Sequence, residues 1–161
     1  MLVTGRAAAF EKAVNAYFND LYRFAYWLCR NRWQAEDLVQ EALLRAWRGW
    51  PGLRDERAVK TWFFTIVHRE LRRAGQRAAR TDSSADSDEL AFDPDPASCV
   101  DVERALRELP APYRAIVFLR EMEGLSTKEV AKVMGISEDN VKARLHRARL
   151  QLQAALGSGA T

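Results

Sequence analysis

The chain has few residues of the kinds that bind metals. It has two cysteines and two histidines among 161 residues, and all four are well separated. Neither Cys29 nor Cys99 belongs to a C-x-x-C motif, and neither His68 nor His146 lies near them in sequence, so the spacing predicts no zinc site. We expect Cys29 to be a small, buried hydrophobic side chain in a reducing compartment.

Long apolar runs and regular alternation are absent as well. No stretch approaches the ~20 apolar residues of a membrane span, so we expect no direct membrane insertion. The first residues lack a basic start followed by an apolar segment, which argues against a secretory signal. Nothing alternates with period two for long enough to indicate a strand, which favours an all-α fold. No phosphate-binding loop or nucleophile–base pair is visible, so we expect neither enzymatic activity nor a cofactor.

The charges that are present are unevenly distributed. Residues 1–80 carry 15 basic and 8 acidic side chains. Residues 81–99 carry no basic and six acidic side chains, and residues 100–161 carry 10 basic and 8 acidic ones. Two basic blocks joined by an acidic connector suggest a polyanionic partner, most simply nucleic acid. We therefore predict two small helical domains, residues 6–80 and 100–156, joined by a flexible acidic linker over 81–99.

Three helices are predicted in the first block, near residues 6–28, 31–47 and 58–79. Asn31 is expected to cap the second helix, whose outward face includes an exposed Leu44, either as a protein contact or as an isolated surface leucine. In the third helix, Trp62, Phe63 and Phe64 are consecutive and cannot all face one core. Phe64 either stacks on an unpaired base or packs against the first helix.

The second block contains the sharpest local signal, a helix-turn-helix over residues 126–152. Ser126 and Glu129 predict a capping box, Gly135 a left-handed turn, and Ser137 the cap of the last helix. Helices are also expected over residues 100–108 and 112–122. The outer face of the last helix is basic, which favours binding in the DNA major groove over a merely solvated surface.

The combination resembles the bacterial RNA polymerase sigma factors, specifically the small extracytoplasmic-function (ECF) group of the sigma-70 family. Residues 34–47 (QAEDLVQEALLRAW) resemble its polymerase-binding helix, and residues 59–67 (VKTWFFTIV) its promoter-melting segment. Residues 106–110 (LRELP), 124–131 (GLSTKEVA) and 141–149 (VKARLHRAR) resemble its C-terminal domain. One departure is His68-Arg69, where many relatives have Arg-Asn.

The resemblance implies three sets of contacts. The coiled coil of the largest polymerase subunit is expected to be contacted by Asp37, Gln40, Glu41 and Leu44. Contacts to the −10 promoter element fall to Arg54 and Asp55, around a flipped base, and to Lys60, Trp62, Phe64, Thr65, His68 and Arg69 along the melted strand. Contacts to the −35 element fall to Asn140, Lys142, Ala143, His146 and Arg147, with Thr127, Lys128 and Arg149 on phosphates.

The resemblance also implies the partners: core RNA polymerase, through its largest subunit and the flap of its second-largest subunit, promoter DNA, and an anti-sigma factor. It implies a cytoplasmic location, either free or at the inner membrane face through the anti-sigma factor. The alternative is a helix-turn-helix regulator that uses the first block to dimerise and binds an inverted repeat without polymerase.

Overall fold

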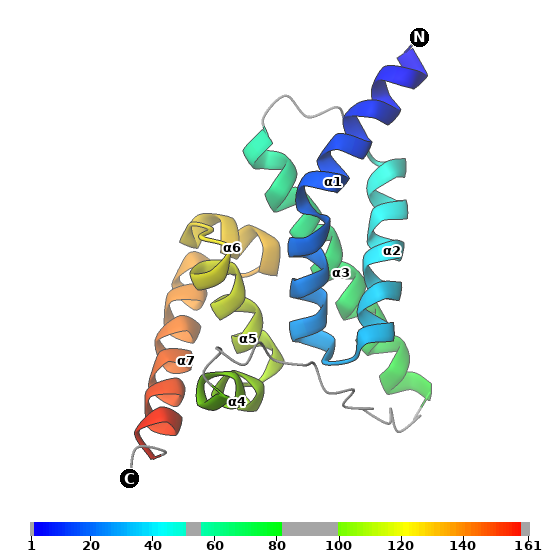
Figure 1. The fold of residues 1–161 in the computed structure, drawn as a ribbon. Helices are drawn as coiled ribbons and strands as arrows, with labels where there is room; N and C mark the ends of the chain where they lie inside the picture. The colour runs from blue at the N-terminus through cyan, green and yellow to red at the C-terminus, as the bar shows by residue number, and fades with distance from the viewer. Residues whose placement is uncertain (1, 51–55, 82–99, 159–161) are drawn as a thin grey trace. The chain divides into compact units, whose positions relative to one another are not determined.

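The computed structural model describes residues 2–50, 56–81 and 100–158 (Figure 1). All regular structure in these ranges is helical, which confirms the predicted all-α class. The contacts divide the chain into two compact units, within residues 1–88 and 89–161. The predicted linker, residues 81–99, lies outside the described ranges except for its first residue.

The first unit is a bundle of three helices: α1 (Leu2–Cys29), α2 (Arg32–Arg48) and α3 (Glu56–Thr81). All three predicted helices are present, and α1 and α3 extend a few residues beyond the predicted bounds. Asn31 caps α2 as expected, because its side chain accepts hydrogen bonds from the N–H groups of Trp33 and Gln34 at 2.9 and 3.0 Å. Figure 1 shows the three helices side by side, so one face of each helix packs into a shared core.

Aromatic rings fill much of that core. Phe24 of α1 and Phe64 of α3 are fully buried and meet edge to face, with ring centroids 5.2 Å apart. Phe63 is also buried, and its ring stacks against that of Trp50, which follows the C-cap of α2. Burial of each phenylalanine contributes about 1.5–3 kcal/mol, so these contacts fix how α3 packs on α1 and α2. Cys29 is half-buried, so its predicted burial is only partly realised.

The second unit contains α4 (Val100–Glu108), α5 (Ala111–Val117), η1 (Phe118–Met122), α6 (Thr127–Met134) and α7 (Glu138–Ser158). The bounds of α4 match the prediction. The helix predicted over residues 112–122 is instead an α-helix that continues as a π-turn, η1. The N–H of Glu123 closes this turn by donating to the carbonyl of Phe118 at 3.0 Å.

Helices α6 and α7 form the predicted helix-turn-helix. Both halves of the capping box are present, since Ser126 and Glu129 each accept from the other's backbone N–H at 3.1 Å. The hydroxyl of Ser137 accepts from the N–H of Asn140 at 3.1 Å and caps α7. Val141, Leu145 and Ala148 form the buried stripe of α7, and Leu152 and Ile136 are half-buried.

Gly135 ends α6 in the left-handed region, with φ of 69° and ψ of 34°. An added Cβ would meet no atom within 4 Å, so a substitution is opposed only by its backbone conformation. We expect Gly135→Ala to destabilise the second unit by about 1–2 kcal/mol, and Gly135→Asn by less, because asparagine tolerates this region better. Hydrogen exchange of the α6 and α7 amides measures this. Equal protection in Gly135→Ala and the parent would contradict it.

Candidate functional site

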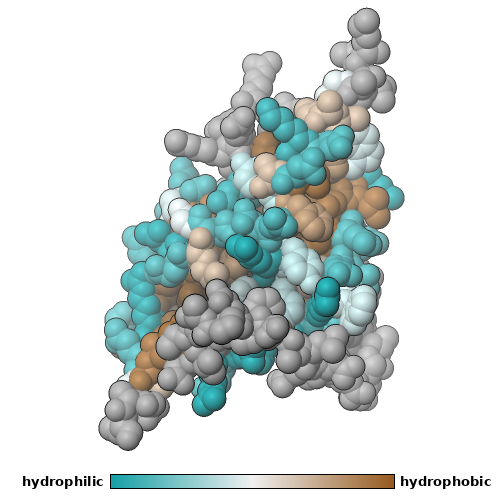
Figure 2. Space-filling view, viewed as in Figure 1, coloured by the Kyte–Doolittle hydropathy of each residue, from teal (hydrophilic) through white to brown (hydrophobic). Residues whose placement is uncertain are grey.

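The outward face of α2 presents four side chains that the sequence singles out. Asp37, Gln40, Glu41 and Leu44 are all exposed, and 52% of the Leu44 surface is accessible. We call this set the α2 face. A cavity of about 430 Å³ lies between α1 and α2, and Figure 2 shows a hydrophobic area where these helices lie together. The cavity is lined by Phe10, Gln40, Leu43, Leu44 and Trp47, so two members of the α2 face, Gln40 and Leu44, border it.

Arg6 of α1 contacts Trp47 of α2 at the edge of this surface. The guanidinium of Arg6 lies 4.9 Å from the ring centroid of Trp47 and donates to the Trp47 carbonyl at 3.0 Å. Phe10 also packs against Trp47, with its ring centroid 5.2 Å from that of Trp47. Trp47 itself is half-buried.

A buried carboxylate joins α2 to α3. Glu70 of α3 is only 3% exposed, and its Oε1 forms ion pairs with Nε of Arg45 on α2 and with Nη1 of Arg73 at 3.0 Å. Both arginines are about half-exposed, so their charges reach solvent while the carboxylate does not. Sequence reasoning missed this cluster, because Arg45 and Glu70 lie 25 residues apart and no local pattern links them.

Half of the predicted −10 contacts on α3 are placed differently from the expectation. Arg69 is exposed, and Lys60 and Trp62 are half-buried and reach the surface. Phe64, Thr65 and His68 are buried and do not reach the surface, and their contact with a DNA strand stays a prediction. Phe64 packs against Phe24, as the alternative predicted, and the Thr65 hydroxyl donates to the Thr61 carbonyl at 2.7 Å. Arg54 and Asp55 lie outside the described residues.

Burial changes the titration of His68. Desolvation, together with the positive charge of Arg72, lowers the pKa of His68 from 6.5 to about 4. The unfolded chain therefore binds a proton below pH 6.5 that the folded chain excludes until about pH 4.

We expect His68 to make the first unit less stable as the pH falls. Between pH 6.5 and about 4 its contribution to the unfolding free energy should decline by about 1.4 kcal/mol per pH unit. All five tryptophans lie within residues 27–62, so tryptophan fluorescence during urea unfolding reports on this unit. His68→Gln should flatten the pH profile in this range, and parallel profiles for variant and parent would contradict the assignment.

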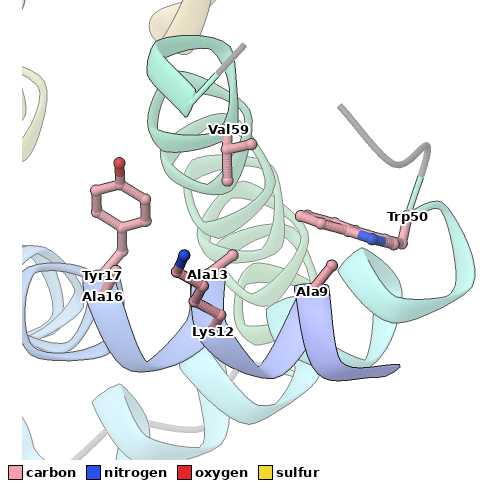
Figure 3. A pocket seen from close by; sticks show the side chains of 7 residues that line it. All are labelled: Ala9, Lys12, Ala13, Ala16, Tyr17, Trp50 and Val59. Atoms are coloured by element: carbon pink, nitrogen blue, oxygen red, sulfur yellow. The ribbon is translucent and has the colours of Figure 1, made fainter. Parts of the chain in front are cut away.

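A second cavity of the first unit, about 330 Å³, lies beside α1 and the first turns of α3 (Figure 3). Figure 3 shows the rings of Trp50 and Tyr17 at two sides of it, with Val59 and the Lys12 amine facing the same space. The Trp50 Nε1 is buried without a hydrogen-bond partner among the described residues. On the α1 side the cavity is lined by three small side chains, those of Ala9, Ala13 and Ala16. No sequence signal distinguished this cavity from ordinary helix packing.

The first turns of α7 carry the predicted DNA-reading set on one outward face. Figure 2 shows mostly hydrophilic atoms over α6 and the adjoining turns of α7. Lys128 at the start of α6 is exposed as well, and Thr127 is half-buried. The exposed members on α7, which we call the α7 face, are Asn140, Lys142, Ala143, His146, Arg147 and Arg149.

One member of the α7 face is already paired. Nη2 of Arg149 donates to Oε1 of Glu121, which lies in η1, and both side chains are about half-exposed. The π-turn thus places a carboxylate against the recognition helix. Because exposed ion pairs contribute only about 0–1 kcal/mol, Arg149 can exchange Glu121 for another anion at little cost.

Metal and membrane sites are not apparent in the described ranges. Among residues 2–50, 56–81 and 100–158, no three histidine, cysteine or acidic side chains are grouped to hold a metal ion. Over the same residues, no helix combines the length and the hydropathy that crossing a bilayer requires.

Comparison with known proteins gives one consistent result. A family model described as Sigma-70 region 2 matches residues 13–81, and one described as Sigma-70, region 4 matches residues 99–152. The ECF RNA polymerase sigma factor SigM of Mycobacterium tuberculosis is 34% identical over 161 residues, covering 96% of this chain and 81% of SigM. SigL of the same organism is 34% identical over 169 residues, covering 94% and 95%.

Solved structures show the same likeness. The sigma factor RpoE, in complex with the anti-sigma factor NepR from Bartonella quintana, matches with a TM-score of 0.79 and 28% identity. The match covers 92% of this chain and 97% of that one. CnrH, in complex with the cytosolic domain of CnrY, matches with a TM-score of 0.68 at 23% identity, which is a likeness of fold.

Proposed function

This chain belongs to the sigma-70 family of RNA polymerase sigma factors, in its ECF group, and on that basis we propose a partner for each of three surfaces. The α2 face binds core polymerase, α3 binds the −10 element, and the α7 face binds the −35 element. The chain is an alternative sigma factor that directs transcription initiation. As a specificity subunit it contributes no catalytic group to RNA synthesis. The observation that carries the assignment is that all four α2 residues and six of the −35 set on α7 are exposed on two outward faces.

The α2 face binds the coiled coil of the largest polymerase subunit. Asp37 and Glu41 supply negative charge that steers and orients a cationic partner surface. Leu44, half-exposed beside an open cavity, is the apolar anchor, since interface energy concentrates in a few side chains that become fully desolvated.

The exposed side of α3 follows the −10 element once the strands separate. Lys60 and Arg69 attract the phosphates, and the half-buried Trp62 offers a ring on which an unpaired base can stack. Arg54 and Asp55, assigned by sequence alone, hold a flipped base. Capture of bases that have left the stack converts binding energy into strand separation, without nucleotide hydrolysis.

The α7 face enters the major groove at the −35 element. Asn140 and Arg147 have the amide and guanidinium donors that read base edges, and Lys128 and Arg149 bind phosphates that fix the register. Two DNA-binding units in one chain raise each other's effective concentration at a promoter with both elements. The flap of the second-largest subunit contacts the same unit.

An anti-sigma factor is the regulatory partner that we propose. The matching RpoE structure is a complex with the anti-sigma factor NepR, which supports a partner of this kind. It would act in the cytoplasm or at the inner membrane face. Affinity purification of the tagged protein from uninduced native cells is expected to recover such a protein at near-equal amounts, and recovery of core polymerase subunits alone would contradict it.

Association with core polymerase separates the sigma factor from the dimeric regulator. We expect the purified protein to sediment with sigma-free core in a one-to-one complex, and to bind promoter duplex weakly by itself. A stable dimer that binds an inverted repeat tightly and ignores core would support the alternative.

The Glu121–Arg149 pair gives a prediction about phosphate binding. We expect Glu121→Gln to strengthen duplex binding by the full protein a few-fold, because Arg149 then has no competing carboxylate. The slope of log K against log salt should stay within about one unit of the parent slope, since one phosphate contact contributes about 0.9. Glu138→Gln, at an exposed acid at the start of α7, is the matched control. Weaker binding by Glu121→Gln would show that Glu121 positions Arg149 instead.

A further inference from the structure

Glu70 is a buried acidic residue that the proposed contacts leave without a role. A carboxylate with 3% exposure requires charged or hydrogen-bonding partners, because burying an unpaired charge is costly. Among the described residues it has two: Arg73, one turn later in α3, and Arg45, which comes from α2. The contact with Arg45 is the one that links Glu70 to the α2 face.

Arg45 lies where its charge affects that face. It directly follows Leu44 and lies one helical turn after Glu41. A glutamate four residues before an arginine forms the favourable orientation of a helical ion pair. An Arg45 side chain that is not held by Glu70 would therefore turn to Glu41 and neutralise it.

The two possible partners of Arg45 compete. Glu70 is rigidly placed on α3 and already desolvated by folding, whereas Glu41 is exposed and its pairing would be screened by water. In the structure Arg45 pairs with Glu70. As a consequence, the negative charge of Glu41 is available to a binding partner. The positive charge of Arg45 is compensated by the buried Glu70 carboxylate.

We propose that Glu70 is a positioning residue of the polymerase-binding surface: it holds Arg45 away from Glu41 and so preserves the negative charge of the α2 face. The inference rests on the proposed function, because it gives Glu70 a role in binding core polymerase. Glu70 itself does not touch the polymerase. Instead, this buried side chain of α3 has an indirect effect on the charge of the α2 face.

The test measures the affinity of fluorescently labelled protein for sigma-free core with four proteins: the parent, Glu70→Gln, Arg45→Gln and the double variant. Glu70→Gln is expected to bind about 10-fold more weakly, because Arg45 then neutralises Glu41. Arg45→Gln should bind within about twofold of the parent, because Glu70 keeps Arg73. The double variant should regain the parent affinity, because no arginine remains to cover Glu41.

Two further variants make the outcome decisive. Glu70→Asp shortens the side chain by one methylene, so it should lose its reach to Arg45, weaken core binding and be rescued by Arg45→Gln. Arg73→Gln is the matched control, since it removes the other cation at Glu70 and should leave core affinity within about twofold of the parent. Tryptophan fluorescence during urea unfolding establishes that each variant is folded.

The pattern of the double variant decides the inference. If Arg45→Gln is as harmful as Glu70→Gln and the double variant shows no recovery, the ion pair only holds α2 and α3 together, and the proposal is overturned. The same holds if Glu70→Gln binds core as tightly as the parent. Failure of the parent itself to bind core would overturn the proposed function instead, so the two failures are distinguishable.

Discussion

Glu41→Lys is expected to lower the affinity for core polymerase by about 100-fold, equivalent to about 2.7 kcal/mol. The substitution reverses a charge at the centre of the α2 face, and like charges brought together across an interface cost several kcal/mol. Glu41 is exposed, so the fold of the first unit should be unchanged. Competition between labelled parent and unlabelled variant for sigma-free core measures the loss.

The matched control for this variant is Glu108→Lys. Glu108 is exposed at the end of α4, so the change in charge is identical, and a cation there suits the helix dipole. We expect its core affinity to stay within about twofold of the parent. Equal competition by Glu41→Lys and Glu108→Lys would mean that the α2 face does not bind polymerase.

Arg147→Glu is expected to abolish selection of promoters through the −35 element. Arg147 lies on the α7 face, away from the buried stripe of Val141, Leu145 and Ala148, so its replacement leaves the packing of α7 intact. Loss of a base contact costs about 1–3 kcal/mol, and a carboxylate facing phosphates adds repulsion, so promoter-dependent transcription should fall about 100-fold.

Two comparisons isolate this effect. Arg104→Glu makes the same change on the exposed side of α4 and should retain promoter selection. Affinity for core in the absence of DNA should be equal for the parent and Arg147→Glu, since the substitution lies outside the α2 face. Unchanged promoter selection by Arg147→Glu would show that another face of the unit meets the DNA.

Local chemistry explains why some parts of the fold were predictable. Ser126, Glu129 and Gly135 act on atoms three or four residues away, so a capping box and a left-handed turn can be predicted without knowing the rest of the fold. The same holds for Asn31 at the start of α2. The exposure of Leu44 also followed from one helix, because the opposite face of α2 is so clearly apolar.

Tertiary packing decided what could not be predicted. Three consecutive aromatics on α3 left the direction of Phe64 open, and its contact with Phe24 on a different helix settled it. The π-turn η1 has no sequence signature, yet it brings Glu121 to Arg149. The Arg45–Glu70 pair likewise depends on how α2 crosses α3.

Run-off transcription tests the central claim most directly. Sigma-free core polymerase is incubated with a library of genomic fragments from the native host, with and without the purified protein, and the 5′ ends of the transcripts are mapped. The protein is expected to produce a discrete set of start sites that share two upstream elements, and Arg147→Glu is expected to lose them. Transcripts from core that are the same with and without the protein would contradict the assignment as a promoter-specificity subunit.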